Sequence, residues 1–271
     1  MATPRWSPVP DFPRLFRGDR YRFEFGIRPA EGHWFRWADP SHPELDERRS
    51  RVQKDSHWHL PWSPPADAVL AELLTIFPER DQPTSGAMVA AELAGAWEPD
   101  FVLLRRTAGE FRLVGACVCD PSWWDPSEKL GHTIETIHAP VPTLNADLGA
   151  RIRTFLHRLP PGQTLVRENW GLAAVPERNL HPAANRPRLN SESTVANTWL
   201  RVEHQAFRTL PGSEGVAFLI WLTVHPLAEV LRDPGIAAAF RRQMETMPPD
   251  IARYKGLEVL GATWWSGLPA E

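Results

Sequence analysis

The residue best placed to do chemistry in this chain is His138, which stands in the run Ile-His-Ala-Pro-Val-Pro at residues 137–142. A proline fixes its own φ and pushes the residue before it toward extended geometry, so the two prolines leave the backbone after His138 few options. We therefore expect a rigid, extended segment that directs the imidazole one way. A histidine held like this is suited to ligating a metal, because a metal ligand must be held in position.

A second group of polar side chains falls on expected strands. Residues 198–210 are expected to form one long strand, in which Arg201, Glu203 and Gln205 share a face because side chains alternate along a strand. Asn169 lies near the end of another expected strand, at 163–172. Such a row has two interpretations: an outer face in contact with water, or an inner face whose charges need partners. In the second case a bound polar or ionic ligand would supply those partners.

Other residues are weaker candidates. His57 and His59 would share one face of an extended segment, but no nearby carboxylate has an obvious ligand geometry. His132 lies six residues before His138 and could compete with it as a ligand. The sequence contains no phosphate-binding Gly-rich loop, no dinucleotide fingerprint, no G-x-S-x-G elbow and no H-E-x-x-H pair.

The elements that must position these groups favour an α+β fold. Strands are expected at residues 21–27, 101–105, 111–119, 163–172, 198–210 and 216–224. Helices are expected at 66–77 and 146–159, and a charged helix that faces solvent on most sides at 43–54. Paired strands with short connections indicate an antiparallel sheet with helices on one side. We expect residues 1–20 to form an extended arm and residues 21–271 a single domain.

Composition narrows the functional classes. The 271 residues carry a formal net charge of −3 with acids and bases interspersed, which argues against nucleic acid as a partner. No apolar run has membrane-spanning length and the first residues lack a signal-peptide pattern, so we expect a soluble, cytoplasmic protein without membrane contact. The two cysteines are too few for the four ligands of an iron–sulfur cluster, so any such centre must come from another chain.

The chain resembles the haem-binding α subunit of haem-dependent oxidative N-demethylases. The resemblance rests on an ordered set of short segments, which run from about residue 20 to residue 257. They are LDERR at 45–49, PSW at 121–123, EKLG at 128–131, IHAPVP at 137–142, NWG at 169–171, LRVEHQ at 200–205 and YKG at 254–256. Each segment alone is weakly specific, whereas the set in this order is fairly specific.

The resemblance implies a fold like that of the PAS sensor domains, an antiparallel sheet with flanking helices that here holds haem b. In the family's best-understood member, the haem iron oxidises a small secondary amine with O₂ and electrons from NADPH. FMN and a 2Fe-2S cluster deliver those electrons and are carried on a partner reductase. The cysteine count of this chain fits that arrangement.

The resemblance also assigns the cofactor-binding residues. His138 aligns with a histidine of the family motif, and we expect it to be the metal ligand, on the proximal side of the haem. We expect Arg201, Lys255 and Tyr254 to bind the cofactor. Arg201 and Lys255 are the candidates for pairing with the haem propionates, where an arginine offers a two-pronged contact.

The expected catalytic residues are Glu203, Arg201, Gln205 and Asn169. Glu203 would accept a cationic amine or transfer a proton, and a polar distal side built from these residues would act on bound O₂. The function that follows is a haem-dependent monooxygenase that carries out oxidative N-demethylation or a related amine oxidation.

Two other functional classes stay open. One is a haem-based gas sensor or a haem-binding protein without turnover, which PAS-like domains commonly are, although this chain shows no attached output domain. The other is a scaffold that has kept the fold and lost haem, against which the intact IHAPVP segment argues.

Overall fold

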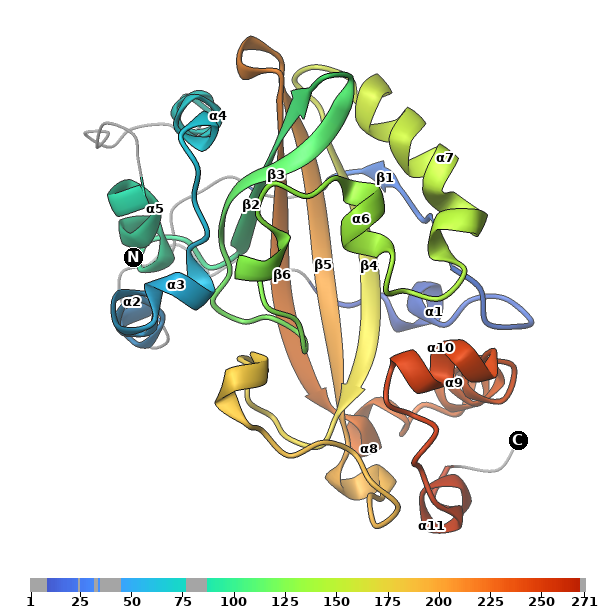
Figure 1. The fold of residues 1–271 in the computed structure, drawn as a ribbon. Coiled ribbons are helices and arrows are strands. Elements are labelled where there is room, and N and C mark those ends of the chain that lie inside the picture. Colours follow the sequence, from blue (N-terminus) through green and yellow to red (C-terminus); the bar gives the residue numbers. More distant parts are fainter. Residues whose placement is uncertain (1–8, 24, 32–33, 35–44, 77–86, 269–271) are drawn as a thin grey trace, which may run out of the picture.

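A computed structural model describes residues 9–23, 25–31, 34, 45–76 and 87–268 of the chain. Its centre is a six-stranded sheet in the order β1-β4-β5-β6-β2-β3, with every neighbouring pair antiparallel (Figure 1). The strands are β1 (Arg28–Pro29), β2 (Asp100–Thr107), β3 (Glu110–Cys117), β4 (Thr164–Ala173), β5 (Trp199–Leu210) and β6 (Gly215–Pro226). The predicted α+β fold with an antiparallel sheet is confirmed.

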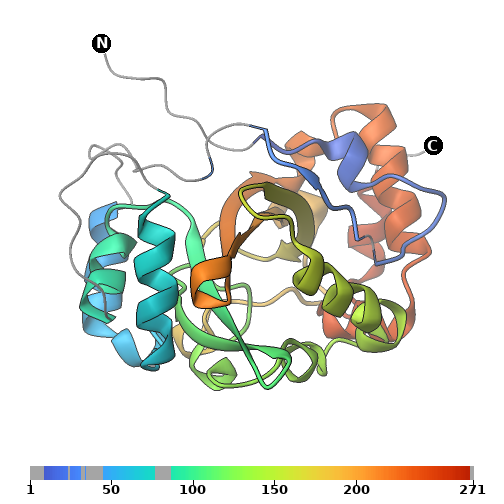
Figure 2. The ribbon, with the colours of Figure 1, turned by 90° about the horizontal axis from the view of Figure 1, so that it is seen from above.

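Helices pack on both faces of this sheet, which corrects the expectation of helices on one side (Figures 1 and 2). They are α1 (Phe12–Leu15), α2 (Leu45–Lys54), α3 (Ser56–His59), α4 (Pro65–Leu74), α5 (Ala87–Ala94), α6 (Ile134–His138), α7 (Leu144–Arg158), α8 (Leu227–Val230), α9 (Pro234–Glu245), α10 (Pro249–Tyr254) and α11 (Ala262–Ser266). Within the described residues, no helix is both long and apolar enough to cross a bilayer.

Most expected elements are present with small shifts at their ends. The helix expected at 146–159 is α7 and that expected at 66–77 is α4, with residue 77 outside the described part of the chain. The strand expected at 21–27 is absent among the described residues of that range, and the chain pairs with β4 only at Arg28–Pro29. Residues 43 and 44 of the charged helix also lie outside the described residues.

Strand alternation divides the side chains of the sheet between its two faces. On the rear face, Leu103, Ala206 and Leu219 pack with α4 and α5, while other strand residues pack with α9, α10 and α11. On the opposite face, which we call the α7 face, Phe207 and Phe218 stack at 4.7 Å beneath α6 and α7. The α7 face therefore consists of the odd-numbered residues of β4 and β5 and the even-numbered residues of β6.

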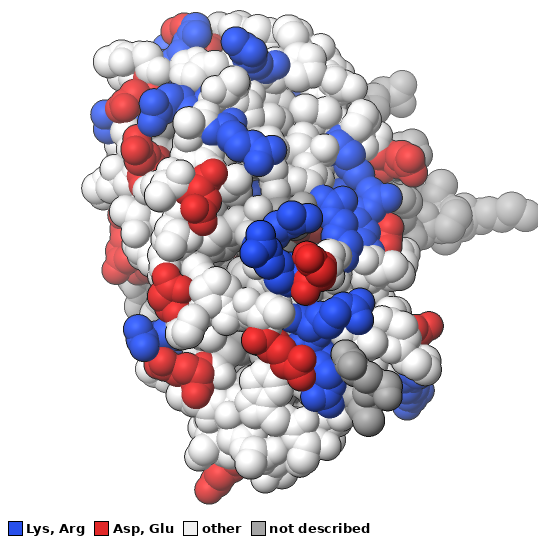
Figure 3. All heavy atoms as spheres, turned by 90° about the vertical axis from the view of Figure 1, so that its right-hand side faces the viewer, with Lys and Arg blue, Asp and Glu red and all other residues white. Residues whose placement is uncertain are grey.

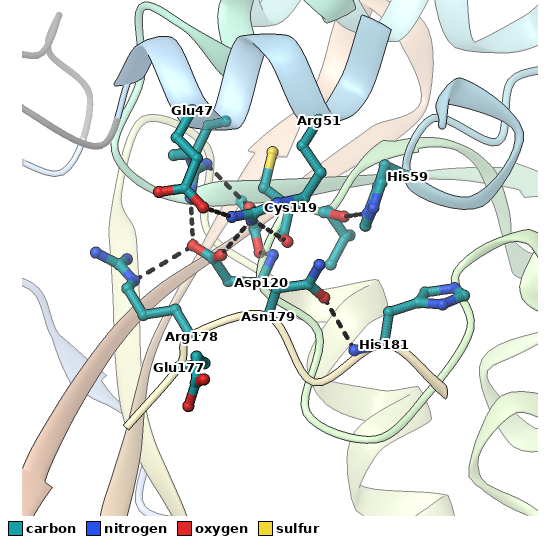
Figure 4. Close-up of polar contacts among 12 residues, drawn as sticks. Glu47, Arg51, His59, Cys119, Asp120, Glu177, Arg178, Asn179 and His181 are labelled. Carbon is teal, nitrogen blue, oxygen red and sulfur yellow. Dashed lines mark hydrogen bonds and ion pairs between the residues drawn. The ribbon is translucent and has the colours of Figure 1, made fainter. Parts of the chain in front are cut away.

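A buried network of charges joins the rear helices to the end of the sheet. Arg48 of α2 donates from Nη1 to Asp120 Oδ2 at 2.6 Å and from Nη2 to Asp100 Oδ1 at 2.9 Å, and the side chains of all three are almost fully buried. Arg51 donates to the other Asp120 oxygen, and Arg178 forms an ion pair with Asp120 from a loop after β4 (Figure 4). Helix α2 is thus less solvent-facing than expected, because one of its arginines is a core residue.

The same network explains the ionisation of Asp120. Burial alone would raise the pKa of this carboxyl, but the charges of Arg178, Arg48 and Arg51 hold it well below its usual range. A carboxylate with three cationic partners stays ionised in the core, and each of the three arginines has this carboxylate as its ion-pair partner. The loop that carries Arg178 is thereby fixed to α2 although the two are distant in sequence.

Replacing Arg48 by Met is expected to destabilise the protein by about 3–5 kcal/mol, because Asp100 and Asp120 would stay buried with a cation removed. The measurement is the free energy of unfolding in urea. The matched control is Arg106→Met, whose partner Glu214 is exposed, and its loss should be much smaller than that of Arg48→Met. Similar losses in the two variants would contradict a buried network that stabilises the fold.

Candidate functional site

The backbone around His138 is a turn and not the extended segment predicted from its prolines. His138 is the last residue of α6, and its carbonyl accepts a hydrogen bond from Val141 N at 2.9 Å. Ala139 has φ −54° and ψ −35°, a helical conformation that a following proline normally disfavours. The hydrogen bond of the turn and the packing of Ile137 of α6 against the apolar residues of the α7 face outweigh that local preference.

Helix α6 is held in place from both ends. The Thr133 hydroxyl accepts from Thr136 N as the N-cap, and Asn145 of α7 donates from Nδ2 to the Glu135 carbonyl at 2.8 Å. The result is a short helix with one defined position over the sheet. The prediction that the His138 side chain is rigidly positioned thus has a structural basis, although a different one from the expected extended backbone.

The His138 imidazole is largely buried and neutral. Its Nδ1 is completely buried and has no hydrogen-bond partner. Burial, and then the positive charge of Arg167, lower the pKa of His138 to about 4. The side chain lines a cavity of about 40 Å³ with Ile134, Ile152 and other residues of α6 and α7. This volume has room for a few water molecules, so a larger ligand would need the less covered part of the α7 face.

The polar row predicted on β5 lies on the α7 face, next to Asn169 of β4. Glu203 Oε2 accepts from Gln205 Nε2 at 3.0 Å and from Asn169 Nδ2 at 3.4 Å. Glu203 and Gln205 are half-buried and Asn169 is exposed, so this row lies at the margin of the covered region. The structure therefore brings three of the predicted catalytic residues together as a carboxylate held by two amides.

Arg201 lies on the same face but is committed to the loop that follows β4. Its Nη1 donates to the Glu177 carbonyl at 2.8 Å, and its Nη2 donates to the Arg178 carbonyl at 2.6 Å and to Ser122 Oγ at 3.3 Å. Only Nε is buried without a partner. Burial lowers the pKa of Arg201 to about 10 despite the opposing charge of Glu203. Arg201 thus fastens two loops to β5 with the two terminal nitrogens that a propionate would need.

Tyr254 and Lys255 approach this group from the end of α10. Lys255 Nζ donates to the Trp170 carbonyl at 2.7 Å and lies 5.2 Å from the Trp170 ring centroid. Burial lowers the pKa of Lys255 to about 8, against the attraction of Glu203 and with the repulsion of Arg167. Burial and the charge of Glu203 raise the pKa of Tyr254. These electrostatic couplings bring both residues into the same neighbourhood as Glu203.

Arg167 belongs to a charged and polar cluster at 167–171 that the sequence places on an expected strand, but no role was predicted for it. It stands opposite Gln205 in the β4–β5 register, and therefore on the α7 face. Its Nε is completely buried without a hydrogen-bond partner, and burial lowers its pKa. The alternation of Arg167 with Asn169 along β4 was the available signal, because residues two apart on a strand share a face.

Among the described residues, part of the α7 face is only partly covered. Gly171 stands opposite Arg201, and a Cβ atom built on it would meet nothing within 4 Å. Ile220 of the central strand β6 is only half-buried. A sheet normally buries its central strands, so this part of the face is a place where a ligand could add cover.

Basic side chains gather on this side of the molecule. Figure 3 shows Lys and Arg concentrated in the middle of the side that lies to the right in Figure 1, where the β4 edge, α7 and α10 are found. The exposed basic residues in these parts include Arg20, Arg22 and Arg151. The surroundings of the site therefore carry more positive charge than the net charge of the whole chain suggests.

The other candidate histidines do not build a metal site. His59 lies in helix α3 with Nδ1 2.8 Å from the Val118 carbonyl, so the expected extended pair with His57 does not form. His132 is exposed. In the described ranges, no three His, Cys, Asp or Glu side chains come together as ligands of a metal ion. Of the histidines proposed as ligands from the sequence, His138 therefore remains the candidate.

His204 lies on the rear face, away from this site. Its Nε2 is 3.1 Å from Thr223 Oγ1, and the ring is almost fully buried. Burial lowers the pKa of His204 to about 4, an effect that the charge of Glu168 opposes. The ring is therefore neutral in the folded protein at physiological pH, which is consistent with a structural role.

This burial predicts a pH dependence of stability that depends on His204. The unfolded chain takes up the proton near pH 6.5 and the folded protein only near pH 4, so stability is complete above pH 6.5 and falls between these values. Wild type should lose up to about 2 kcal/mol more than His204→Gln between pH 7 and pH 5, measured by urea unfolding. The exposed control His132→Gln should keep the wild-type difference, and equal losses in wild type and His204→Gln would contradict the prediction.

Comparison with protein families agrees with this geometry. A family described as "haem-dependent oxidative N-demethylase, alpha subunit-like" matches residues 81–264, about two thirds of the chain. The matched range contains His138, the polar row on β4 and β5, and the end of α10. This chain therefore belongs to the family of haem-dependent oxidative N-demethylase α-subunit-like proteins.

Proposed function

We propose that this chain is the haem-b-binding subunit of an O₂-using enzyme that oxidises an amine, by oxidative N-demethylation or a related reaction. The observation that carries the proposal is His138, a rigidly held imidazole on the α7 face that has a buried, unpartnered Nδ1. The low pKa of His138 keeps its ring neutral at physiological pH, and a neutral imidazole is the form that ligates iron. The family membership supports haem as the group that His138 would hold.

The residues around His138 fit a haem. A porphyrin iron needs one or two axial side chains from the protein, so the lack of a three-residue metal cluster in the described ranges agrees with this cofactor. Lys255 and Tyr254 are proposed to contact it from α10. Arg201 is a weaker propionate partner than the sequence suggested, because its terminal nitrogens already bind loop carbonyls. A PAS-like arrangement is part of this proposal.

Glu203 is the proposed binding group for the amine. A carboxylate held by the amides of Asn169 and Gln205 has a fixed position and retains a free oxygen for an ammonium group. The same carboxylate can take the proton that a protonated secondary amine must lose before oxidation at nitrogen or the adjacent carbon. When bound, haem would supply the O₂-dependent oxidation itself.

Electrons are proposed to come from a partner reductase that carries FMN and a 2Fe-2S cluster. The family name describes an α subunit, which implies an assembly with other subunits. Cys117 and Cys119 are both buried and free, and two thiolates do not complete the four ligands of such a cluster. The electron-transfer groups are therefore assigned to a separate chain.

The first test is the absorption spectrum of the protein, oxidised, reduced and then with CO. We expect a Soret band that shifts with CO in wild type and is lost in His138→Ala. In His138→Gly, added imidazole should restore the band, which separates loss of the ligand from loss of the fold. An unchanged spectrum and full haem content in His138→Ala would overturn the assignment of the axial ligand.

The second test separates an enzyme from a sensor. Glu203→Gln should keep stoichiometric haem and lower kcat/KM for dimethylamine by about 10–100-fold, because a charge-assisted contact of about 1.5–3 kcal/mol is lost. The assay measures formaldehyde with a surrogate reductase, and Arg106→Gln is the control. Haem binding without turnover of secondary or N-methyl amines in wild type would favour the alternative, a haem-based sensor or carrier.

A further inference from the structure

The charges on the α7 face do not balance. Arg167 and Lys255 both couple electrostatically to Glu203, whose bound partners are two neutral amides. The nearest other carboxylate along β4, Glu168, points to the rear face and pairs with Arg28. Arg167 also couples electrostatically to Glu168, but that carboxylate already binds Arg28. The two cations therefore depend on Glu203 and on a carboxylate that has another partner, in surroundings where burial disfavours charge.

Arg167 is the less satisfied of the two cations. Lys255 has a hydrogen bond to the Trp170 carbonyl and lies over the Trp170 ring. Arg167 instead has a completely buried Nε that binds nothing. A guanidinium with a buried Nε that makes no hydrogen bond is destabilising for the protein alone, and it is expected where a ligand completes the site.

The position of Arg167 indicates what it could reach. It lies on the α7 face between Leu165, which packs beneath α7, and Asn169, which is exposed. Its charge lowers the pKa of both His138 and Lys255. Arg167 is therefore electrostatically coupled both to the proposed axial ligand and to the end of α10.

We propose that Arg167, assisted by Lys255, binds a carboxylate group of a ligand on the α7 face. A guanidinium can donate two parallel hydrogen bonds to a carboxylate, and the ammonium of Lys255 adds a second positive charge. Two molecules could bring this group: a haem, through a propionate, or a substrate that is an N-methyl amino acid and not a simple amine. Both sources rest on the proposed function, but binding of the amino acid can be measured without haem.

Two matched ligand pairs distinguish these sources. Haem b and its dimethyl ester differ only in the propionate charges, and sarcosine and dimethylamine are both N-methyl secondary amines of which only sarcosine has a carboxylate. Dissociation constants of all four are measured on the full chain, by absorption for the haems and by calorimetry for the amines. Wild type should prefer the carboxylate member of at least one pair by about 10–100-fold, the range for charged hydrogen bonds.

The variants decide whether Arg167 causes that preference. Arg167→Gln should abolish it, Arg167→Lys should retain part of it, and the exposed control Arg106→Gln should retain all of it. Equal affinity within both pairs in wild type, or an unchanged preference in Arg167→Gln, would overturn the carboxylate site. If wild type binds neither haem, the proposed function fails, and the sarcosine pair alone then supports or overturns this site.

A stability measurement tests whether Arg167 serves only to stabilise the fold. Without ligand, Arg167→Met should unfold at a temperature roughly 2–4 °C above wild type, because a buried, unpartnered charge is removed. With the preferred carboxylate ligand, the order should reverse. A large loss of stability in ligand-free Arg167→Met would show that Arg167 serves the fold, and would overturn the proposal.

Discussion

The arrangement of the whole site depends on the buried carboxylate of Asp120. Arg48 and Arg51 bind it from α2, behind the sheet, and Arg178 binds it from the loop after β4 (Figure 4). Two backbone carbonyls of that loop in turn accept hydrogen bonds from the guanidinium of Arg201, a residue of β5. One carboxylate thus connects the rear helices to the strand that carries Glu203, so the proposed binding row is held from behind as well as by its own sheet. A charge centre in the core here sets the positions of residues on the opposite face.

The strands of the sheet could be predicted from the sequence, because strand formation depends largely on local residue patterns. Strong β-forming runs at 198–210 and 216–224, separated by a turn, predict a hairpin wherever the chain places it, and alternation then assigns Arg201, Glu203 and Gln205 to one face. His138 could also be singled out from the sequence, because a histidine followed by two closely spaced prolines is an unusual run. Its backbone was predicted wrongly, since the preference of Ala139 for extended geometry is small beside a turn hydrogen bond and the burial of Ile137.

The sequence could not predict which side chains would be buried by elements distant along the chain. Arg48 and Arg167 both occur in charged runs that look solvated, yet Arg48 is a core residue and Arg167 has a buried Nε. Arg48 is buried against Asp100 and Asp120, which are distant from it along the chain, and local composition carries no record of such contacts. Arg201 shows the converse. Its position on the face was predictable, but its commitment to the carbonyls at 177 and 178 depends on a loop whose path is set by Asp120.

The two buried arginines show the difference between a charge that serves the fold and one that awaits a ligand. Arg48 has a partner for each terminal nitrogen and lies where carboxylates already stand, so its desolvation is offset within the chain. Arg167 has the same chemistry and is also partly removed from water, but its Nε has no partner, and the two carboxylates that it couples to are held by amides and by Arg28. A fold under selection for stability alone would replace such an arginine with an apolar side chain. Its presence on the α7 face is therefore best understood as a requirement of what binds there.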